Sequence, residues 1–192
     1  MRIKYDTIHQ RSDTIMKGVT SKKLTLGGVM AALVLVGTMI IQIPTPTKGY
    51  IHIGDSMVYL CGIFLGPVYG ALAAAIGSFL ADALSGYMVY APATFVIKGL
   101  DAFVVGIIYY KIVQEGDSVP KRILGFLVAA LLGGALMVGG YLVYESFLYK
   151  FETALLGVVG NITQVIGGAI VALPLLMGLE KSKVIQRYVK EF

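Results

Sequence analysis

The chain has 192 residues, of which 57% are apolar and only 14% are charged, and its mean hydropathy is +0.80. A soluble domain carries about 25% charged residues, so this composition excludes an ordinary water-soluble fold and indicates an integral membrane protein. The apolar runs are longer than the roughly 9–11 residues of a membrane β-strand and do not alternate, which favours helices.

The first 23 residues are polar and basic, and they lack the short apolar region that a cleavable signal peptide requires. We therefore expect a basic cytoplasmic tail over residues 1–23, a single six-helix domain over residues 24–178 and a second basic tail over residues 179–192. The fold class is all-α, a compact bundle of six transmembrane helices. Hydropathy places the spans at residues 24–43, 54–66, 67–85, 94–113, 122–144 and 153–178.

The second predicted span is short, because about 20 residues are needed to cross a bilayer. The sequence "LGPVYG" joins it to the third span, and its Gly-Pro pair predicts a tight helical hairpin. The single cysteine, Cys61, lies in the second span and has no partner for an internal disulfide.

The distribution of the basic residues predicts the topology. Six spans place both termini on one side of the membrane, and that side collects all of the 16 lysines and arginines except Lys48, Lys98 and Lys150. The positive-inside rule therefore predicts that both termini are cytoplasmic. Topology and lipid head groups then explain the net charge of +5 better than a nucleic-acid partner does.

Ionisable residues near the lipid-embedded part are not scattered but fall at the predicted outer ends of the helices. They are Asp55, Asp82, Lys98, Asp101, Glu145 and Glu152. Charged residues at such depths are costly and usually face the bundle interior or a water-filled cavity. This distribution predicts a polar site in the outer part of the bundle.

Helical spacing predicts which of these polar residues point inward. Asp82 belongs to a stripe of small residues that starts at Gly70, and such stripes are helix-packing faces. Lys98 and Asp101 share a face of the fourth span. A further shared face, in the sixth span, holds Gly157, Asn161, Gln164 and Gly168.

Each polar group also has a purely structural interpretation. Asp82 and Lys98 are as well explained by an ion pair between helices as by ligand contact, and the amides of Asn161 and Gln164 by hydrogen bonds between helices. The tyrosines of this region belong either to an interfacial belt or to a pocket wall; they are Tyr50, Tyr59, Tyr87 and Tyr90. His52 has no second histidine near it in the sequence, which argues against a metal site.

No catalytic motif is present in the sequence. There is no Walker A motif, so ATP hydrolysis would have to come from a partner. The two histidines lie in the tail and in a loop, so a serine–histidine protease would lack a base on a helix. A binding or transport protein remains. In the first span, Gly27 with Ala31 and Gly28 with Ala32 form small-residue pairs, which spacing alone assigns to internal packing.

Three motifs resemble the substrate-binding (S) components of energy-coupling factor (ECF) vitamin transporters. They are Gly-Tyr-Ile-x-Ile-Gly-Asp entering the second span, Gly-Ser-x-x-Ala-Asp in the third and Pro-x-Thr-x-x-x-Lys-Gly-Leu in the fourth. The resemblance covers residues 24–178. It implies a six-helix protein without a cofactor that captures a vitamin or precursor from outside, and that works with a transmembrane (T) component and two cytoplasmic ATPases.

The resemblance also implies residue roles. Gly28 and Ala32 match the family's contact with the T component, which replaces the internal-packing interpretation of the first span. Asp55 belongs to a motif shared by members with different substrates, so we expect it to cap its helix or orient a gating loop. The expected substrate-binding residues are Tyr50, His52, Asp82, Tyr87, Lys98, Asn161 and Gln164.

The subgroup that the sequence most resembles transports hydroxymethylpyrimidine, vitamin B6 compounds or riboflavin. Hydroxymethylpyrimidine or a vitamin B6 compound is the best guess, although amides and a few charges suit several vitamins. The competing class is a stand-alone secondary transporter or channel in which the buried Asp and Lys residues relay protons. The lack of an inverted repeat between the two halves argues against it.

Overall fold

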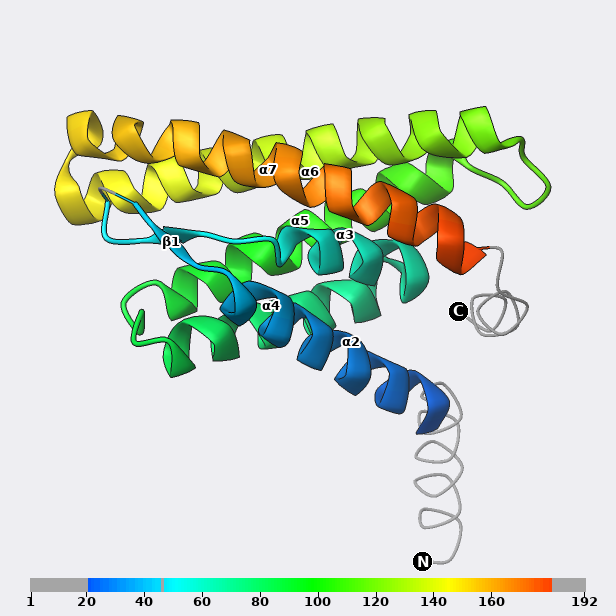
Figure 1. Ribbon diagram of the computed structural model, residues 1–192, viewed down its shortest axis with the longest axis horizontal. Coiled ribbons are helices and arrows are strands. Elements are labelled where there is room, and N and C mark those ends of the chain that lie inside the picture. Colours follow the sequence, from blue (N-terminus) through cyan, green and yellow to red (C-terminus); the bar gives the residue numbers. More distant parts are fainter. Residues whose placement is uncertain (1–20, 46, 181–192) are drawn as a thin grey trace, which may run out of the picture.

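The computed structural model describes residues 21–45 and 47–180, and Figure 1 shows their arrangement. The elements are α2 (Ser21–Ile40), β1 (Ile43–Pro44), β2 (Tyr50–Ile51), α3 (Asp55–Phe64), α4 (Gly66–Leu84), α5 (Ala91–Ile112), α6 (Val119–Tyr149) and α7 (Phe151–Glu180). Most of each predicted basic tail, residues 1–20 and 181–192, lies outside the described residues.

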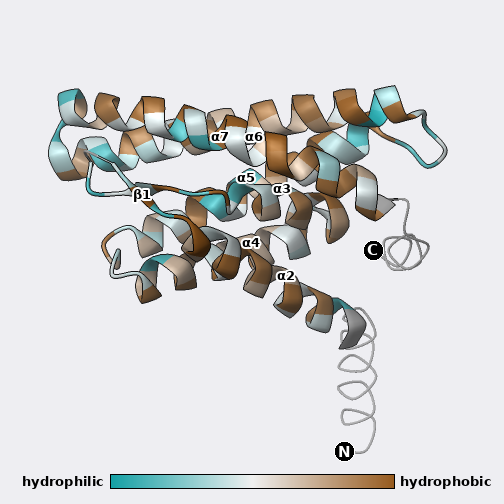
Figure 2. Ribbon diagram, viewed as in Figure 1, coloured by the Kyte–Doolittle hydropathy of each residue, from teal (hydrophilic) through white to brown (hydrophobic). Residues whose placement is uncertain are grey.

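Five of the described helices are long and apolar enough to cross a membrane: α2, α4, α5, α6 and α7. The longest, α6, has 31 residues and spans about 45 Å at 1.5 Å per residue. Hydrophobic residues dominate the middle of the helices, and hydrophilic residues concentrate in the connections at the two ends (Figure 2). Large apolar side chains such as Leu72, Leu131 and Ile170 are exposed, as expected of a lipid-facing surface.

The short second span corresponds to α3, which has only 10 residues. It packs against α2, α4, α5 and α7, and every one of its residues except Met57 is buried. Helix α3 is therefore a core element rather than a full membrane span. It joins α4 through Leu65, where Gly66 adopts a φ of +75° and Pro67 follows in the first turn of α4, as the Gly-Pro motif predicts.

Small residues allow close approach between the helices. The stripe on α4 is buried from Gly70 to Asp82, which confirms its inward orientation. A Cβ atom on Gly77 would collide with the Ala31 carbonyl of α2, and one on Gly62 of α3 would collide with the Ala102 carbonyl of α5. These contacts are the small-residue packing that membrane helices use.

The segment between α2 and α3 forms a short β-hairpin, which an all-α prediction did not include. Ile43 pairs with Ile51 and Pro44 with Tyr50 in antiparallel register. The turn is closed by the Thr45 N–H, which donates to the Gly49 carbonyl at 2.9 Å. Strands of two residues are too short to produce a detectable alternation in the sequence. The hairpin ends α2 at Ile40, three residues before the predicted boundary at 43.

The connections of the bundle are divided between its two ends. Residues 41–51, 85–90 and 150 lie at one end of the bundle, on the left in Figure 1, and the chain runs from the hairpin back to α3. Residues 113–118, the start of α2 and the end of α7 lie at the other end. The described ends of the chain thus share one end of the bundle. Which membrane face that end occupies stays a prediction.

Candidate functional site

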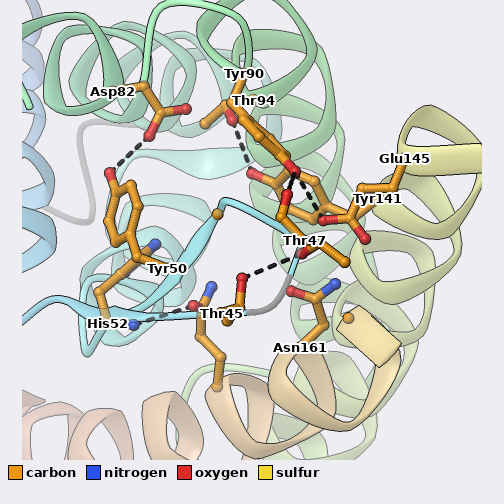
Figure 3. A pocket seen from close by; sticks show the side chains of 13 residues that line it. Thr45, Thr47, Tyr50, His52, Asp82, Tyr90, Thr94, Tyr141, Glu145 and Asn161 are labelled. Carbon is orange, nitrogen blue, oxygen red and sulfur yellow. Dashed lines mark hydrogen bonds between the residues drawn. The ribbon is translucent and has the colours of Figure 1, made fainter. Parts of the chain in front are cut away.

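A polar pocket lies at the hairpin end of the bundle, with an empty volume of about 430 Å³ that includes space open to solvent. The hairpin segment and the ends of α4, α5, α6 and α7 form its wall (Figure 3). The lining residues are Thr45, Thr47, Gly49, Tyr50, His52, Asp82, Tyr90, Thr94, Tyr141, Glu145, Gly157, Asn161 and Gln164. The pocket therefore draws on segments far apart in the sequence.

One side of the pocket is built by Tyr50 and Asp82. The Tyr50 hydroxyl donates to Asp82 Oδ1 at 2.6 Å, which ties the hairpin to the end of α4. Burial and the adjacent Asp82 carboxylate raise the pKa of Tyr50 above its ordinary value, so the phenol keeps its proton. The second oxygen of Asp82, Oδ2, is buried and makes no hydrogen bond to any described residue.

The opposite side is built by Tyr90 and Glu145. The Tyr90 hydroxyl lies 2.6 Å from the Thr47 carbonyl and 3.1 Å from Glu145 Oε1. Its single hydrogen favours the shorter contact, which holds the hairpin against α5. The other oxygen of Glu145, Oε2, is buried without a hydrogen-bond partner among the described residues.

Gln164 connects the pocket to the core. Its Oε1 accepts from the backbone N–H of His52 at 3.1 Å, and its Nε2 donates to Asp55 Oδ2 at 3.1 Å. One amide therefore holds both the hairpin segment and the start of α3. A Cβ on Gly168, one turn along α7, would contact Asp55 Cβ at 2.8 Å, so glycine is needed for α7 to approach this closely.

His52 is a neutral side chain in this arrangement. Its Nδ1 accepts from the backbone N–H of Gly54 at 3.1 Å, which leaves the proton on Nε2. Burial lowers the pKa of His52 to about 4, since the charged imidazolium loses its hydration. The residue can therefore donate from Nε2 but does not bring a positive charge to the pocket.

Lys98 and Asp55 form a fully buried ion pair beneath the pocket, and both side chains are 0% exposed. The Lys98 ammonium also lies 5.7 Å from the centroid of the Tyr141 ring. The structural alternative from the sequence, an ion pair between Lys98 and Asp82, is wrong, because Asp82 bonds Tyr50 instead. The capping role for Asp55 is not observed either: its carboxylate binds Lys98 and Gln164, and α3 has no side-chain cap.

The expected binding residues are divided by the structure. Tyr50, His52, Asp82, Asn161 and Gln164 all line the pocket. Tyr87 does not line it but packs on Tyr50, with ring centroids 4.5 Å apart. Lys98 lies beneath it. The expected T-component residues Gly28 and Ala32 are exposed on α2, far from the hairpin.

Several lining residues were missed in the sequence, notably Thr94 and Tyr141, whereas Glu145 was counted in the outer polar site but not among the expected binding residues. Their helical spacing carried a signal: Thr94 precedes Lys98 by four residues, and Tyr141 precedes Glu145 by four. The hydroxyls of Thr94 and Tyr141 share a hydrogen bond of 2.9 Å. Glu145 was assigned to a loop because the fifth span was predicted to end at 144, whereas α6 continues to Tyr149.

The fold and the pocket define a multi-pass membrane protein with a polar pocket at one end of its helical bundle. A sequence profile of the ECF-type riboflavin transporter S component family matches residues 18–181. The chain belongs to this family. The resemblance in the three motifs is thereby confirmed.

Two relatives with known sequences match most of the chain. It is 36% identical over 139 residues to a Pyrococcus woesei protein described as an uncharacterized protein in the gap 3′ region, covering 72% of this chain and 88% of that protein. It is 26% identical over 178 residues to the thiamine precursor transporter HmpT of Lactococcus lactis subsp. cremoris (strain MG1363), covering 92% of this chain and 98% of that protein.

Proposed function

We propose that this chain is the substrate-specific subunit of an ECF-type importer, and that it captures a water-soluble vitamin or precursor from outside the cell. Hydroxymethylpyrimidine or a vitamin B6 compound is the best candidate. The observation that carries the proposal is the polar pocket under the hairpin, in which two buried carboxylates each keep an oxygen without a partner among the described residues. The likeness to a thiamine precursor transporter along 92% of the chain supports the same class of substrate.

Transport requires partners that this chain does not supply. The S component works with a transmembrane T component and two cytoplasmic ATPases, as family membership implies. The surface for the T component is the small-residue face of α2 at Gly28 and Ala32. Both residues are exposed, and a Cβ on Gly28 would have no atom within 4 Å. A bulky side chain there changes the surface without disturbing the bundle.

The test of the pocket is equilibrium binding to the purified full-length protein. Isothermal titration calorimetry with hydroxymethylpyrimidine, pyridoxine, pyridoxamine, riboflavin and thiamin should identify at least one compound that binds with micromolar or tighter affinity. Absence of binding by all five compounds would contradict the proposed substrate class.

The test of coupling uses Gly28→Leu and Ala32→Leu. Each should weaken assembly with the T component and abolish uptake in reconstituted vesicles, while calorimetry shows unchanged substrate binding. The matched control is Leu33→Ala, also on the exposed part of α2. A variant that assembles normally but loses substrate binding would place this face in the bundle interior.

The topology is tested by labelling single cysteines in intact cells, in a variant whose Cys61 is replaced by alanine. Cysteines at Ser85 and Lys150, which lie at the hairpin end of the bundle, should react with a membrane-impermeant reagent. Reaction only after permeabilisation would reverse the predicted orientation. This result would also place the pocket on the cytoplasmic side.

A further inference from the structure

Resting on the proposed function, we infer that the pocket selects for charge: it takes a small neutral or cationic heteroaromatic compound with N–H or O–H donors at two ends, and it rejects anionic analogues. The donors pair with Asp82 on one side and with Glu145 on the other. This goes beyond vitamin binding, since many vitamins are carboxylic acids or phosphate esters.

The pocket contains two carboxylate oxygens that are free to accept hydrogen bonds. Asp82 and Glu145 are only 4% and 3% exposed, and they lie on opposite sides of the pocket in Figure 3. Asp82 Oδ2 and Glu145 Oε2 have no hydrogen-bond partner among the described residues. Buried polar atoms are rarely left unpaired in native proteins, so these two oxygens are available for donors of a ligand.

Neighbouring hydroxyl groups do not form hydrogen bonds with these two free oxygens. Thr94 interacts with the Asp82 carboxylate and Thr47 with the Glu145 carboxylate, but neither hydroxyl reaches hydrogen-bond geometry at Asp82 Oδ2 or Glu145 Oε2. In this structure the Thr94 hydroxyl bonds Tyr141 at 2.9 Å, and the Thr47 hydroxyl bonds Thr45 at 3.1 Å. Glu145 Oε2 packs closely against Gly157 of α7, because a Cβ there would collide with it.

In the described part of the chain, the residues that line the pocket bring no positive charge to it. None of the described residues that line the pocket is lysine or arginine. His52 is neutral, because burial lowers its pKa to about 4. The Lys98 ammonium is bound to Asp55 beneath the pocket. An anionic ligand would therefore meet two carboxylates without a counter-charge, which is unfavourable in a buried site.

Between the two carboxylates, the pocket is lined by aromatic rings and hydrogen-bond donors. Tyr50, Tyr90 and Tyr141 line the pocket and supply aromatic rings that a flat heteroaromatic ring can contact. His52 Nε2–H and the amide of Asn161 supply donors for acceptor atoms of the ring, such as a ring nitrogen. A heteroaromatic ring with an amino group and a hydroxyl group satisfies this pattern.

The experiment uses two pairs of compounds that have the same ring and nearly the same size. The first pair is pyridoxamine and 4-pyridoxic acid. The second is 4-amino-5-hydroxymethyl-2-methylpyrimidine and the 5-carboxylic acid of the same pyrimidine. Titration calorimetry on the purified full-length protein should give a Kd at least about 100-fold lower for the amine or alcohol than for the acid. Equal or tighter binding of an acid would overturn the inference.

Two variants assign the selectivity to the carboxylates. Asp82→Asn and Glu145→Gln should each weaken binding of the amine or alcohol about 10- to 100-fold. They should also reduce the preference over the acid about 10-fold, an effect that a loss of stability alone would not produce. Glu152→Gln is the matched control, because Glu152 is exposed and does not line the pocket.

The outcomes separate the two proposals. Wild-type affinity and selectivity in both variants would overturn the charge-selection mechanism and leave the proposed function intact. Binding of riboflavin or thiamin with no selection against the acids would also overturn the charge-selection mechanism and leave the proposed function intact. Failure of every compound to bind would overturn the proposed function itself.

Discussion

Two pairs of buried charged residues lie near the same end of the bundle, and they differ in how far their hydrogen bonds are satisfied. Asp55 and Lys98 bind one another, and Gln164 occupies the second oxygen of Asp55. Asp82 and Glu145 contact tyrosine hydroxyls through one oxygen each and leave the other oxygen free of partners among the described residues. All four residues are nearly or fully buried.

This difference in hydrogen bonding assigns a structural role to Asp55 and Lys98 and a binding role to Asp82 and Glu145. Removing charges from water costs several kcal/mol per ion unless good partners compensate, so the complete pair at Asp55 holds α3 and α5 together without need of a ligand. The free oxygens of Asp82 and Glu145 gain hydrogen bonds only when another molecule supplies donors.

The largest expected effect comes from breaking the complete pair. Lys98→Met should lower the free energy of unfolding by about 3–5 kcal/mol, because it leaves the Asp55 carboxylate buried without a counter-charge. Denaturant titration in detergent micelles measures the change. Lys121→Met is the matched control, since Lys121 pairs with Asp117 at the surface and its loss should not be resolved.

A double variant sharpens this prediction. Asp55→Leu combined with Lys98→Met removes both charges and should recover part of the lost stability. A stable Lys98→Met protein that had lost only ligand binding would instead assign Lys98 to the pocket. That result would remove the distinction between the two charge pairs.

A smaller effect is expected when the two amides of α7 are compared. Gln164→Ala should weaken substrate binding and the free energy of unfolding by about 1–3 kcal/mol each, because Asp55 and the His52 backbone lose a partner. Asn161→Ala should weaken binding over a similar range and leave stability unchanged, because its amide makes no hydrogen bond to the described residues. Calorimetry and denaturant titration on both variants make the comparison. Equal stability losses in the two would contradict it.

The last predicted change concerns pH and His52. The pKa of His52 is about 4 in the fold against about 6.5 in an unfolded chain, so the unfolded state binds the proton first as pH falls. Stability contributed by the neutral imidazole is complete above about pH 6.5 and is lost on acidification toward pH 4. Between pH 7 and 5 the loss should be about 2 kcal/mol.

His52→Asn isolates this contribution, since the asparagine Oδ1 can still accept from the Gly54 N–H. The variant should lose about 2 kcal/mol less than the wild type between pH 7 and 5, as measured by denaturant titration at both values. Parallel pH profiles in the two proteins would show that the imidazole is not held neutral.

Hydropathy was enough to predict the approximate positions of the helices, and helical periodicity was enough to predict the inward faces of Asp82, Lys98 and Gln164. It could not predict which of these residues meet. Partner choice depends on how far each helix is rotated and translated against its neighbours, and close contacts at glycines such as Gly62 and Gly168 set those relations. The sequence therefore placed Lys98 correctly in the interior but with the wrong carboxylate.

The part of the site that sequence analysis missed lies in segments with a weak or misread pattern. Thr45 and Thr47 belong to a hairpin of two-residue strands, whose position over the pocket depends on hydrogen bonds to Tyr90 and Asp82. Glu145 was counted in the outer polar site but left out of the expected binding residues, because hydropathy ended the fifth span at residue 144 and placed it in a loop. Its spacing of four from Tyr141 was the available signal.

The most direct test of the pocket as a substrate site is mass spectrometry of small molecules that co-purify with the protein. The wild type and the Asp82→Asn/Glu145→Gln double variant are purified side by side from the same growth medium. The wild type should retain a near-equimolar amount of a neutral or cationic heteroaromatic compound that carries amino or hydroxyl groups, and the variant should lose it. The same compound at the same stoichiometry in both proteins would contradict the assignment.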